Sequence, residues 1–358
     1  MKVHPSALKH GGSSEDAIEA AEWSLWIEPL DENNRPPDRE LRLGFDIGAL
    51  LLETVVLVFE SGDEMGIHAL PARRKYLDLL PSSPRSARVC ISATAVTSSD
   101  CYLRGLRLSP AYRLMARLAI GWKAPRQPVL GLVLSGEVDS VGPDAKLFEV
   151  GDRVFGFNRH LYGTYAQYVC WPDDGLLAPR PANCTDEESV AIVYGGLLGL
   201  HFMRKADVRA GQSVLVFGAS GAVGTSAVQL ARYLGADVTG VCSTANVDLV
   251  ASLGATTVID YTSEDFTDRA ERYDLIFDAV GTRKSAAALR QCRQVLALGG
   301  ACVSVDDGTP KLRREDLVLL GELATTGEIR PVIDRTYALD EIVDAHRYVD
   351  TGTSAATW

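Results

Sequence analysis

The sequence predicts an α/β protein in which a doubly wound parallel sheet accompanies a second, partly open β-barrel-like unit. From Ser213 to Val305, runs rich in β-forming residues alternate with helical patterns, which is typical of a parallel sheet covered by helices. Between Ser86 and Pro181, short β-rich runs are separated by frequent glycines, which is typical of a partly open barrel.

The strongest single pattern is SVLVFGASGAVG at Ser213–Gly224. A β-rich run ends at Phe217, a glycine turn follows, and a helical pattern then extends to a stop at Gly235. The turn has the spacing A-x-G-x-x-G where the dinucleotide fingerprint has G-x-G-x-x-G. Missing side chains let a pyrophosphate approach the backbone, and a helix N-terminus offers free N–H groups. We therefore expect a nucleotide here. The alternative is that Gly221 and Gly224 only allow close packing of helix on strand.

The rest of this region supplies the context that the glycine turn requires. A helical pattern at Val247–Leu253 is closed by Gly254. In such sheets, ligands bind at the carboxyl ends of the strands. The further predicted strands are Asp237–Cys242, Thr257–Tyr261, Tyr273–Phe277 and Ala301–Val305.

The end of the second predicted strand bears on the choice of nucleotide. An NAD site usually carries Asp or Glu there to hold the ribose hydroxyls, whereas this chain has Ser243 and Thr244. Small hydroxyl side chains leave room for a 2′-phosphate, and Tyr261 after the next strand is expected to reach the same place. We therefore expect NADPH. The alternative is that Ser243 and Thr244 only cap a helix.

Composition excludes several other classes of protein. The chain of 358 residues is 46% hydrophobic, which supports sizeable cores, and its net charge of −11 argues against nucleic acid or an anionic membrane as partner. No apolar run is long enough to span a bilayer, and no signal peptide is evident. The seven cysteines form no C-x-x-C pair and the six histidines are scattered. We therefore expect a cytoplasmic protein with reduced thiols and no metal site.

The barrel-like unit and the start of the following helix have their own signals. A capping-box spacing at Thr185–Glu188 opens a helix. The predicted strands of the barrel-like unit are Arg88–Ala93, Pro128–Val141, Val150–Phe157 and Thr164–Trp171.

Taken together, these segments resemble the medium-chain dehydrogenase/reductase superfamily, and within it the zinc-independent quinone-oxidoreductase branch. The resemblance covers most of residues 69–352 and implies a GroES-like catalytic domain at 69–185, a Rossmann domain at 186–312 and a C-terminal segment, 313–358, that returns to the catalytic domain. Residues 1–68 form an atypical N-terminal segment with a helical patch near Ala17–Trp26. The similarity is carried by Thr94–Gly105, Pro128–Gly142, Val150–Phe157, Gly163–Pro172, Val214–Thr244 and Arg330–Gly352.

The resemblance also implies which residues hold the coenzyme. The 2′-phosphate would be held by Ser243, Thr244 and Tyr261, and the nicotinamide ribose would pass Val280 and Gly281. The residues of the pyrophosphate turn would be Gly218, Ser220, Gly221, Ala222, Val223 and Gly224.

On the substrate side, the resemblance implies the catalytic candidates Thr97, Ser99, Asp100 and Tyr102. A hydroxyl in this loop can hydrogen-bond the carbonyl oxygen of an acceptor and stabilise the developing enolate. The alternative is that Thr97 and Ser99 cap a helix and Asp100 fastens a turn. Zinc-dependent relatives carry Cys and His-Glu where this chain has Thr97 and Leu132-Val133, so a catalytic zinc is not expected.

Three departures from the family pattern concern two missing strands and one residue near the nicotinamide. A further strand and helix before Arg313 are missing, Thr353–Trp358 supplies no final strand, and Leu198 stands where relatives often carry Thr near the nicotinamide. Loss of an edge strand is expected to weaken a possible homodimer. We interpret the two missing strands as coding segments that are lost or mis-spliced in this sequence.

The function expected from the resemblance is NADPH-dependent reduction of a quinone or an α,β-unsaturated carbonyl by hydride transfer without zinc. Two alternatives stay open, namely a biosynthetic enoyl reductase on the same scaffold and an NADPH-binding protein with little turnover. The shape of the substrate pocket depends on loops such as Leu106–Arg126, in which Tyr112–Trp122 is either a lid or part of the core.

Overall fold

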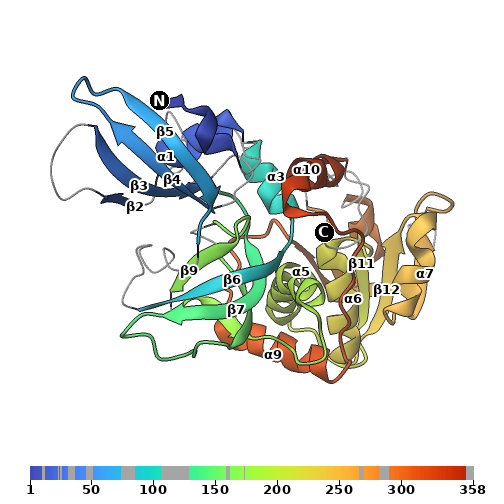
Figure 1. Ribbon diagram of the computed structural model, residues 1–358. Coiled ribbons are helices and arrows are strands. Elements are labelled where there is room, and N and C mark those ends of the chain that lie inside the picture. Colours follow the sequence, from blue (N-terminus) through green and yellow to red (C-terminus); the bar gives the residue numbers. More distant parts are fainter. Residues whose placement is uncertain are drawn as a thin grey trace. The chain divides into compact units, whose positions relative to one another are not determined.

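The computed structural model describes residues 1–9, 13–22, 24, 26–30, 37–45, 51–73, 85–105, 129–158, 162–172, 174–265, 270–281 and 290–351 (Figure 1). Two compact units are distinguished. The first comprises Met1–Ile91, Val138–Gly151 and Gly163–Asp173, and the second comprises Ser92–Glu137, Asp152–Tyr162 and Asp174–Trp358. The expected substrate loop Tyr112–Trp122 and the end of the chain after residue 351 lie outside the described residues.

The first unit contains a five-stranded sheet in the order β1-β5-β4-β3-β2. Strands β2 to β5 pair antiparallel with their sequence neighbours, and β1 pairs parallel with β5. The strands are β1 (Lys2–Val3), β2 (Trp26–Pro29), β3 (Asp38–Phe45), β4 (Leu51–Val58) and β5 (Glu64–Pro71). The short helix η1 (Pro5–Leu8) and helix α1 (Ser14–Glu22) lie between β1 and β2 along the chain.

Helix α1 packs closely on this sheet through small residues. A Cβ added at Gly44 in β3 would lie 2.0 Å from the carbonyl oxygen of Ala20 in α1, so only glycine allows this approach. Arg42, buried under the helix, pairs with Glu40 and Glu64 at 2.7 and 2.6 Å. The helical patch expected near Ala17–Trp26 is therefore real but ends at Glu22, and the strands around it were not predicted from the sequence.

A second sheet has the strand order β10-β8-β7-β6-β9. Within the first unit β6 pairs with β9, and within the second unit β8 pairs with both β7 and β10, all antiparallel. Its inward side chains are large and fully buried, for example Leu134, Phe155 and Leu177 in the second unit. The strands are β6 (Ser86–Thr94), β7 (Val133–Val141), β8 (Arg153–Phe157), β9 (Tyr168–Pro172) and β10 (Leu176–Pro179).

The third sheet, in the second unit, is entirely parallel and has the order β13-β12-β11-β14-β15. Val214 and Val216 of β11 join the core that contains the helices, whereas Leu215 joins a separate core with Ile276 on the other face. Both faces are therefore buried, as a doubly wound sheet requires. The strands are β11 (Ser213–Phe217), β12 (Asp237–Cys242), β13 (Thr257–Asp260), β14 (Tyr273–Asp278) and β15 (Leu296–Ser304).

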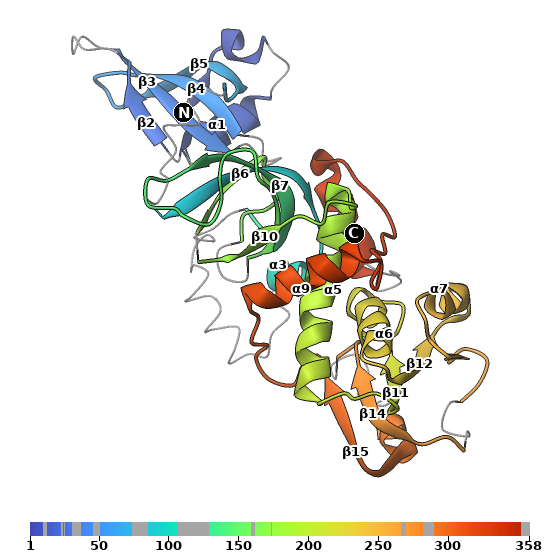
Figure 2. The same ribbon diagram turned by 90° about the horizontal axis from the view of Figure 1, so that it is seen from below.

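Helices α5 and α6 lie side by side, and α6 also packs on β11 and β12 (Figures 1 and 2). A Cβ added at Gly195 in α5 would lie 2.0 Å from the carbonyl oxygen of Ala222 in α6, so the two backbones nearly touch. The helices of the second unit are α3 (Ser98–Arg104), α5 (Asp186–Lys205), α6 (Ala222–Tyr233), α7 (Val247–Ser252), α9 (Arg314–Thr325) and α10 (Ile342–Asp350), with short turns η2 (Thr244–Asn246), η4 (Arg293–Val295) and η5 (Leu339–Glu341).

Most predicted elements of the second unit are confirmed within a few residues. The helix after the glycine turn buries Ala227 and Leu230 and ends before Gly235, whose φ is 82°. The capping box at the start of α5 is present, with both Thr185 and Glu188 bonded to each other's backbone. Residues 305–313 contain neither strand nor helix, as expected from the shortened sequence there. Strand β10 was not predicted.

Candidate active site

The carboxyl ends of the parallel strands bring the predicted coenzyme residues to one edge of the sheet. The glycine turn follows β11, Ser243 and Thr244 follow β12, Tyr261 follows β13, and Val280 and Gly281 follow β14. Because all pairings in this sheet are parallel, these ends share one edge. The chain direction along the sheet reverses at β11, and such a switch point is where doubly wound sheets bind ligands.

The glycines of the turn differ in what they make room for. A Cβ at Gly224 would lie 2.0 Å from the Gly218 carbonyl oxygen, so Gly224 is required for packing. A Cβ at Gly218 would lie 2.4 Å from Val280 Cγ2, and its φ of 79° also favours glycine. At Gly221, in contrast, the nearest atom to an added Cβ is 3.6 Å away. Packing alone therefore explains Gly224 and Gly218 but not Gly221.

Gly221 occupies the N-cap of α6 and provides no side chain to cap the helix. The first N–H groups of a helix have no intrahelical partners, so here they are available to an anion. The open space at Gly221 lies next to these groups. The turn therefore fits a diphosphate, and Ser220, Ala222 and Val223 belong to the same short segment.

The expected 2′-phosphate residues carry a feature that the sequence analysis overlooked. The Thr244 hydroxyl donates to Asp260 Oδ2 at 2.6 Å, and Thr262 donates to Asp260 Oδ1 from its backbone nitrogen at 2.9 Å and from its hydroxyl at 2.7 Å. Hydrogen bonds from Thr244 and then Thr262 lower the pKa of Asp260 to about 2, so the carboxylate is charged. Tyr261 is 55% exposed beside it. An exposed negative charge is thus present close to Thr244.

Asn246 links the glycine turn to the residues that follow β12. Its side-chain nitrogen donates to Ser220 Oγ at 3.2 Å and to Ser243 Oγ at 3.3 Å. Ser243 stands at the N-cap of η2 but makes no side-chain capping bond, so the capping alternative does not explain it. The glycine turn and the end of β12 are therefore held together by an amide that the sequence analysis did not single out.

The loop after β14 is fixed by a buried carboxylate. Asp278 is fully buried, and its Oδ1 accepts from the backbone nitrogens of Val280 at 3.0 Å and Gly281 at 3.1 Å. Its Oδ2 accepts from the Ser304 hydroxyl at 3.0 Å, which ties β14 to β15. Asp278 thereby positions both residues expected beside the nicotinamide ribose.

A pocket of about 460 Å³ opens beside this loop, within the second unit. It brings together two predicted catalytic residues, Ser99 and Tyr102 of α3, with three predicted coenzyme residues, Val223, Val280 and Gly281. Its other lining residues are mostly apolar or aromatic and include Leu132, Phe157, Tyr162, Tyr194 and Leu198, together with Ser98 and Asp306.

Thr97 and Asp100, the other two catalytic candidates, are buried and bond to each other. The Thr97 backbone nitrogen and hydroxyl both donate to Asp100 Oδ2, at 2.8 and 2.6 Å, and the Asp100 nitrogen donates back to Thr97 Oγ1 at 3.4 Å. This reciprocal arrangement opens α3 in the manner of a helix cap. Neither residue is among those that line the pocket. Their catalytic role stays a prediction.

Ser99 makes a different contact. Its hydroxyl lies 2.7 Å from the hydroxyl of Tyr194, which projects from α5. The Tyr194 ring packs near Phe157, with centroids 6.3 Å apart. Burial raises the pKa of Tyr194, so its phenol is protonated at physiological pH. The pocket wall therefore has two directly bonded hydroxyls.

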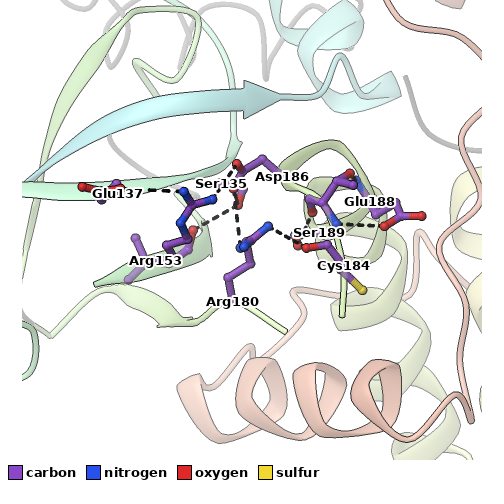
Figure 3. Close-up of polar contacts among 10 residues, drawn as sticks. Ser135, Glu137, Arg153, Arg180, Cys184, Asp186, Glu188 and Ser189 are labelled. Carbon is purple, nitrogen blue, oxygen red and sulfur yellow. Dashed lines mark hydrogen bonds and ion pairs between the residues drawn. The ribbon is translucent and has the colours of Figure 1, made fainter. Parts of the chain in front are cut away.

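Helix α5 is fastened at its N-terminus to the barrel strands of the second unit (Figure 3). Ser135 of β7 donates to Asp186 Oδ1 at 2.7 Å, and Arg153 of β8 lies 3.8 Å from Asp186 Oδ2. Arg180 approaches the same carboxylate at 3.7 Å and donates to the Cys184 carbonyl at 2.6 Å. These contacts fix the start of the helix that carries Tyr194.

Helix α3 is held from its other side by α10. Cys101 Sγ lies 3.4 Å from His346 Nδ1, and Arg104 pairs with Asp350. Burial lowers the pKa of His346 to about 4, with Arg104 contributing. The imidazole is therefore neutral at physiological pH. Helix α10 thus supports the helix that carries Ser99 and Tyr102.

Two family models match the chain. The alcohol dehydrogenase GroES-like domain matches residues 83–182, and the zinc-binding dehydrogenase domain matches residues 222–342. The chain belongs to the medium-chain dehydrogenase/reductase superfamily. This confirms the resemblance inferred from the sequence, and with it the Rossmann sheet and the GroES-like, partly open barrel.

Individual members of the superfamily are similar over most of the chain. A 2-methylene-furan-3-one reductase of Solanum lycopersicum is 31% identical over 248 residues, which are 64% of this chain and 62% of that protein. A chloroplastic NADPH-dependent alkenal/one oxidoreductase of Arabidopsis thaliana is 28% identical, again over 64% and 62%. The chain thus spans about three fifths of these relatives. The solved quinone oxidoreductase of Coxiella burnetii has a TM-score of 0.67 at 25% identity, covering 77% of this chain and 91% of that one.

The superfamily includes zinc-dependent members, but the described part of this chain holds no group of three or more His, Cys, Asp or Glu side chains able to bind a metal ion. Leu132 and Val133, at the expected ligand positions, are buried apolar residues. None of the described helices is both long enough and apolar enough to cross a membrane.

Sequence reasoning missed several site residues of this superfamily member. Asp260 lies within a strand that was identified, and Asp278 and Asn246 follow identified strands, so their places were visible, but their hydrogen bonds are tertiary. Leu198 was expected near the nicotinamide, and Tyr194 lies one helical turn before it on the same face of the helix. This spacing could have indicated Tyr194 as a site residue. Tyr162 lines the pocket with a φ of 49°, which no sequence pattern reveals.

Proposed function

We propose that this protein reduces an α,β-unsaturated carbonyl or a quinone with a reduced nicotinamide dinucleotide, without zinc. The observation that carries the proposal is the pocket shared by Ser99 and Tyr102 with Val223, Val280 and Gly281. It places hydroxyl groups beside the residues expected to contact the nicotinamide ribose. A hydride acceptor bound there would meet both.

The chemistry of the pocket favours an acceptor that is already electron-poor. The coenzyme, when bound, supplies a hydride. The chain supplies a wall in which most residues are apolar or aromatic, and a Ser99 hydroxyl that can hydrogen-bond a carbonyl oxygen. No metal ligand stands at Leu132 or Val133, so a simple alkoxide would lack the Lewis acid that alcohol oxidation uses. The names of the tomato and Arabidopsis relatives, an enone-type reductase and an alkenal/one oxidoreductase, support the same substrate class.

NADPH is the proposed coenzyme, held at its 2′-phosphate by Ser243, Thr244 and Tyr261. The absence of Asp or Glu at the end of β12 supports it, as does the name of the Arabidopsis relative. One observation favours NADH instead, because Asp260 engages the Thr244 hydroxyl and adds a negative charge nearby. Because this carboxylate would repel a 2′-phosphate, we expect only a modest preference for NADPH.

The proposal is tested by mixing purified protein with NADPH or NADH and following the nicotinamide absorbance after addition of acceptors. The panel comprises a benzoquinone, a short 2-alkenal, a cyclic enone and a crotonyl thioester, with ethanol plus oxidised coenzyme as the control for alcohol oxidation. We expect enone or quinone reduction that is insensitive to a zinc chelator. Preference for the thioester would indicate a biosynthetic enoyl reductase. Coenzyme binding without turnover of any acceptor would indicate a binding protein.

The remaining expectations belong to the same proposal. The domain boundaries 69–185, 186–312 and 313–358 apply to the catalytic, coenzyme and returning segments. A cytoplasmic location is consistent with seven cysteines that are all unpaired. A homodimer would use β15, which is an edge strand of the described sheet. Light scattering of the purified protein measures the oligomeric state.

A further inference from the structure

Three hydroxyl groups meet at the wall of the pocket. Ser98 and Ser99 begin α3, and Tyr194 projects from the middle of α5. Tyr194 contacts Ser99 at 2.7 Å, and Ser98 is the residue next to Ser99 at the start of α3. All three residues line the pocket. We call them the hydroxyl cluster (Ser98, Ser99 and Tyr194).

Counting donors shows that the cluster has one left for a ligand. Each hydroxyl carries one O–H and can accept through its lone pairs. The contact between Ser99 and Tyr194 uses one of their two protons, whichever oxygen donates. Of the contacts described for these two residues, none uses the other. One O–H of the cluster is therefore available to an acceptor atom in the pocket.

The position of Tyr194 is set by rigid neighbours rather than by a loop. Its side chain is 8% exposed, and its ring packs near Phe157 of β8. Asp186, eight positions earlier, anchors α5 to Ser135 of β7 (Figure 3). Donors that are fixed before the reaction stabilise developing charge without reorganisation. Burial also favours the protonated phenol, the form that donates.

The face of α5 that carries Tyr194 also meets the coenzyme side of the pocket. Leu198, one turn later on the same face, lines the pocket together with Val280 and Gly281. The hydroxyl cluster therefore faces the same space as the residues expected at the nicotinamide ribose. A carbonyl oxygen hydrogen-bonded to the cluster would belong to a molecule in reach of that ring.

We propose that Tyr194 is a catalytic residue whose phenol, together with Ser99, binds the carbonyl oxygen of the acceptor. The inference rests on the proposed function and extends it to a residue of α5. In the step, the C4–H bond of the dihydronicotinamide breaks and a C–H bond forms at the β-carbon of the enone. The electron pair of the C=C bond moves to give an enolate, whose oxygen carries the charge, and the nicotinamide is oxidised. The cluster stabilises this oxygen by hydrogen bonding, and water then protonates the α-carbon.

The test compares Tyr194→Phe, Ser99→Ala and the double variant with a matched control. Phenylalanine keeps the ring against Phe157 and removes only the hydroxyl. Tyr233→Phe is the control, because Tyr233 is 45% exposed on α6 and is not among the pocket-lining residues. For each protein, kcat and KM for the best enone, the coenzyme Kd by nicotinamide fluorescence, and the unfolding midpoint are measured.

We expect Tyr194→Phe and Ser99→Ala each to lower kcat about 10- to 100-fold while the coenzyme Kd changes less than about twofold. The kcat of the double variant should be little below that of the single variant with the lower kcat, because the hydroxyls act as a unit. An unchanged kcat in Tyr194→Phe, or a loss of kcat matched by the loss in coenzyme affinity or by Tyr233→Phe, overturns the inference. Wild-type protein that reduces no acceptor overturns the proposed function itself, which separates the two failures. Ser99→Ala decides the matter if Tyr194→Phe does not fold.

Discussion

Replacing each of two glycines in the turn after β11 by alanine should separate packing from coenzyme binding. At Gly224 the new Cβ would lie 2.0 Å from the Gly218 carbonyl oxygen and 2.8 Å from Ala219 Cα, far inside the ordinary contact distance of about 3.5 Å. Both are backbone atoms, so strand and helix must move apart. Overpacking of this kind costs up to about 3 kcal/mol, and the better helix propensity of alanine returns about 1 kcal/mol. We expect Gly224→Ala to lower the free energy of unfolding by about 2 kcal/mol.

Gly221→Ala should behave in the opposite way. Its φ of −75° and ψ of 171° suit any residue, and the nearest atom to the added Cβ is 3.6 Å away. Stability should therefore change by no more than about 0.5 kcal/mol, because a poorer N-cap is offset by a stiffer unfolded chain. The methyl group would occupy the space beside the free N–H groups of α6. We expect it to weaken coenzyme binding at least about tenfold, which corresponds to about 1.4 kcal/mol.

The two variants are compared by urea unfolding and by fluorescence titration with NADPH and NADH. The matched pair controls itself, since each glycine is the reference for the other. If folded Gly221→Ala binds both coenzymes as tightly as the wild type, the diphosphate does not lie at this turn, and the proposed function loses its basis.

The remaining predictions concern charge, protonation and the start of α3. Asp260→Asn should raise the affinity for NADPH relative to NADH in fluorescence titrations, and an unchanged ratio of affinities would show that the carboxylate lies away from the 2′ position. Because the pKa of Asp260 is about 2 and the second pKa of a phosphate monoester is about 6, the wild-type preference should stay constant from about pH 7 to about pH 9. His346 has a pKa lowered to about 4 by burial, whereas an unfolded histidine has about 6.5, so the unfolded chain binds the extra proton first. The contribution of His346 to the free energy of unfolding should therefore be constant above about pH 6.5 and fall by about 3 kcal/mol as the pH drops toward 4. His346→Gln should abolish this contribution to the pH dependence, which urea unfolding at several pH values measures. Thr97→Val should lower stability by about 1 kcal/mol, and its kcat tests the predicted catalytic role of Thr97. A kcat within about twofold of the wild type would reject that role, whereas a large loss of kcat at unchanged stability would show that Thr97 contacts the substrate.

The sequence determined the parallel sheet and the coenzyme edge because these depend on local patterns. A strand, a glycine turn and a helix follow one another within Ser213–Gly235. The spacing of the apolar residues and the glycines that end each element predict all three. Once several such units alternate, the carboxyl ends of their strands must share an edge. Ser243, Tyr261 and Gly281 therefore lie at the same edge of the sheet as the glycine turn, and their contacts with a coenzyme stay a prediction.

The first unit was less accessible to sequence reasoning. Strands β3 and β4 pair with each other along their whole length, from Asp38–Val58 to Phe45–Leu51, but their side chains do not alternate regularly between polar and apolar. Arg42 and Glu53 are buried within them and paired with other charges, which breaks the expected pattern. A buried ion pair looks like a solvated surface in a sequence, so the strands were not predicted.

Only the tertiary structure decided which side chains act together in the site. Thr97 and Asp100 were as plausible as Ser99 in the sequence, but folding turns the first two toward each other and the third toward Tyr194 on a helix nearly a hundred residues away. The reason is physical. Local patterns fix where a backbone turns and which faces are buried, whereas a hydrogen bond between two helices depends on how they pack, and that is set by the close approach of α5 and α6 and by the anchoring of α3 on α10.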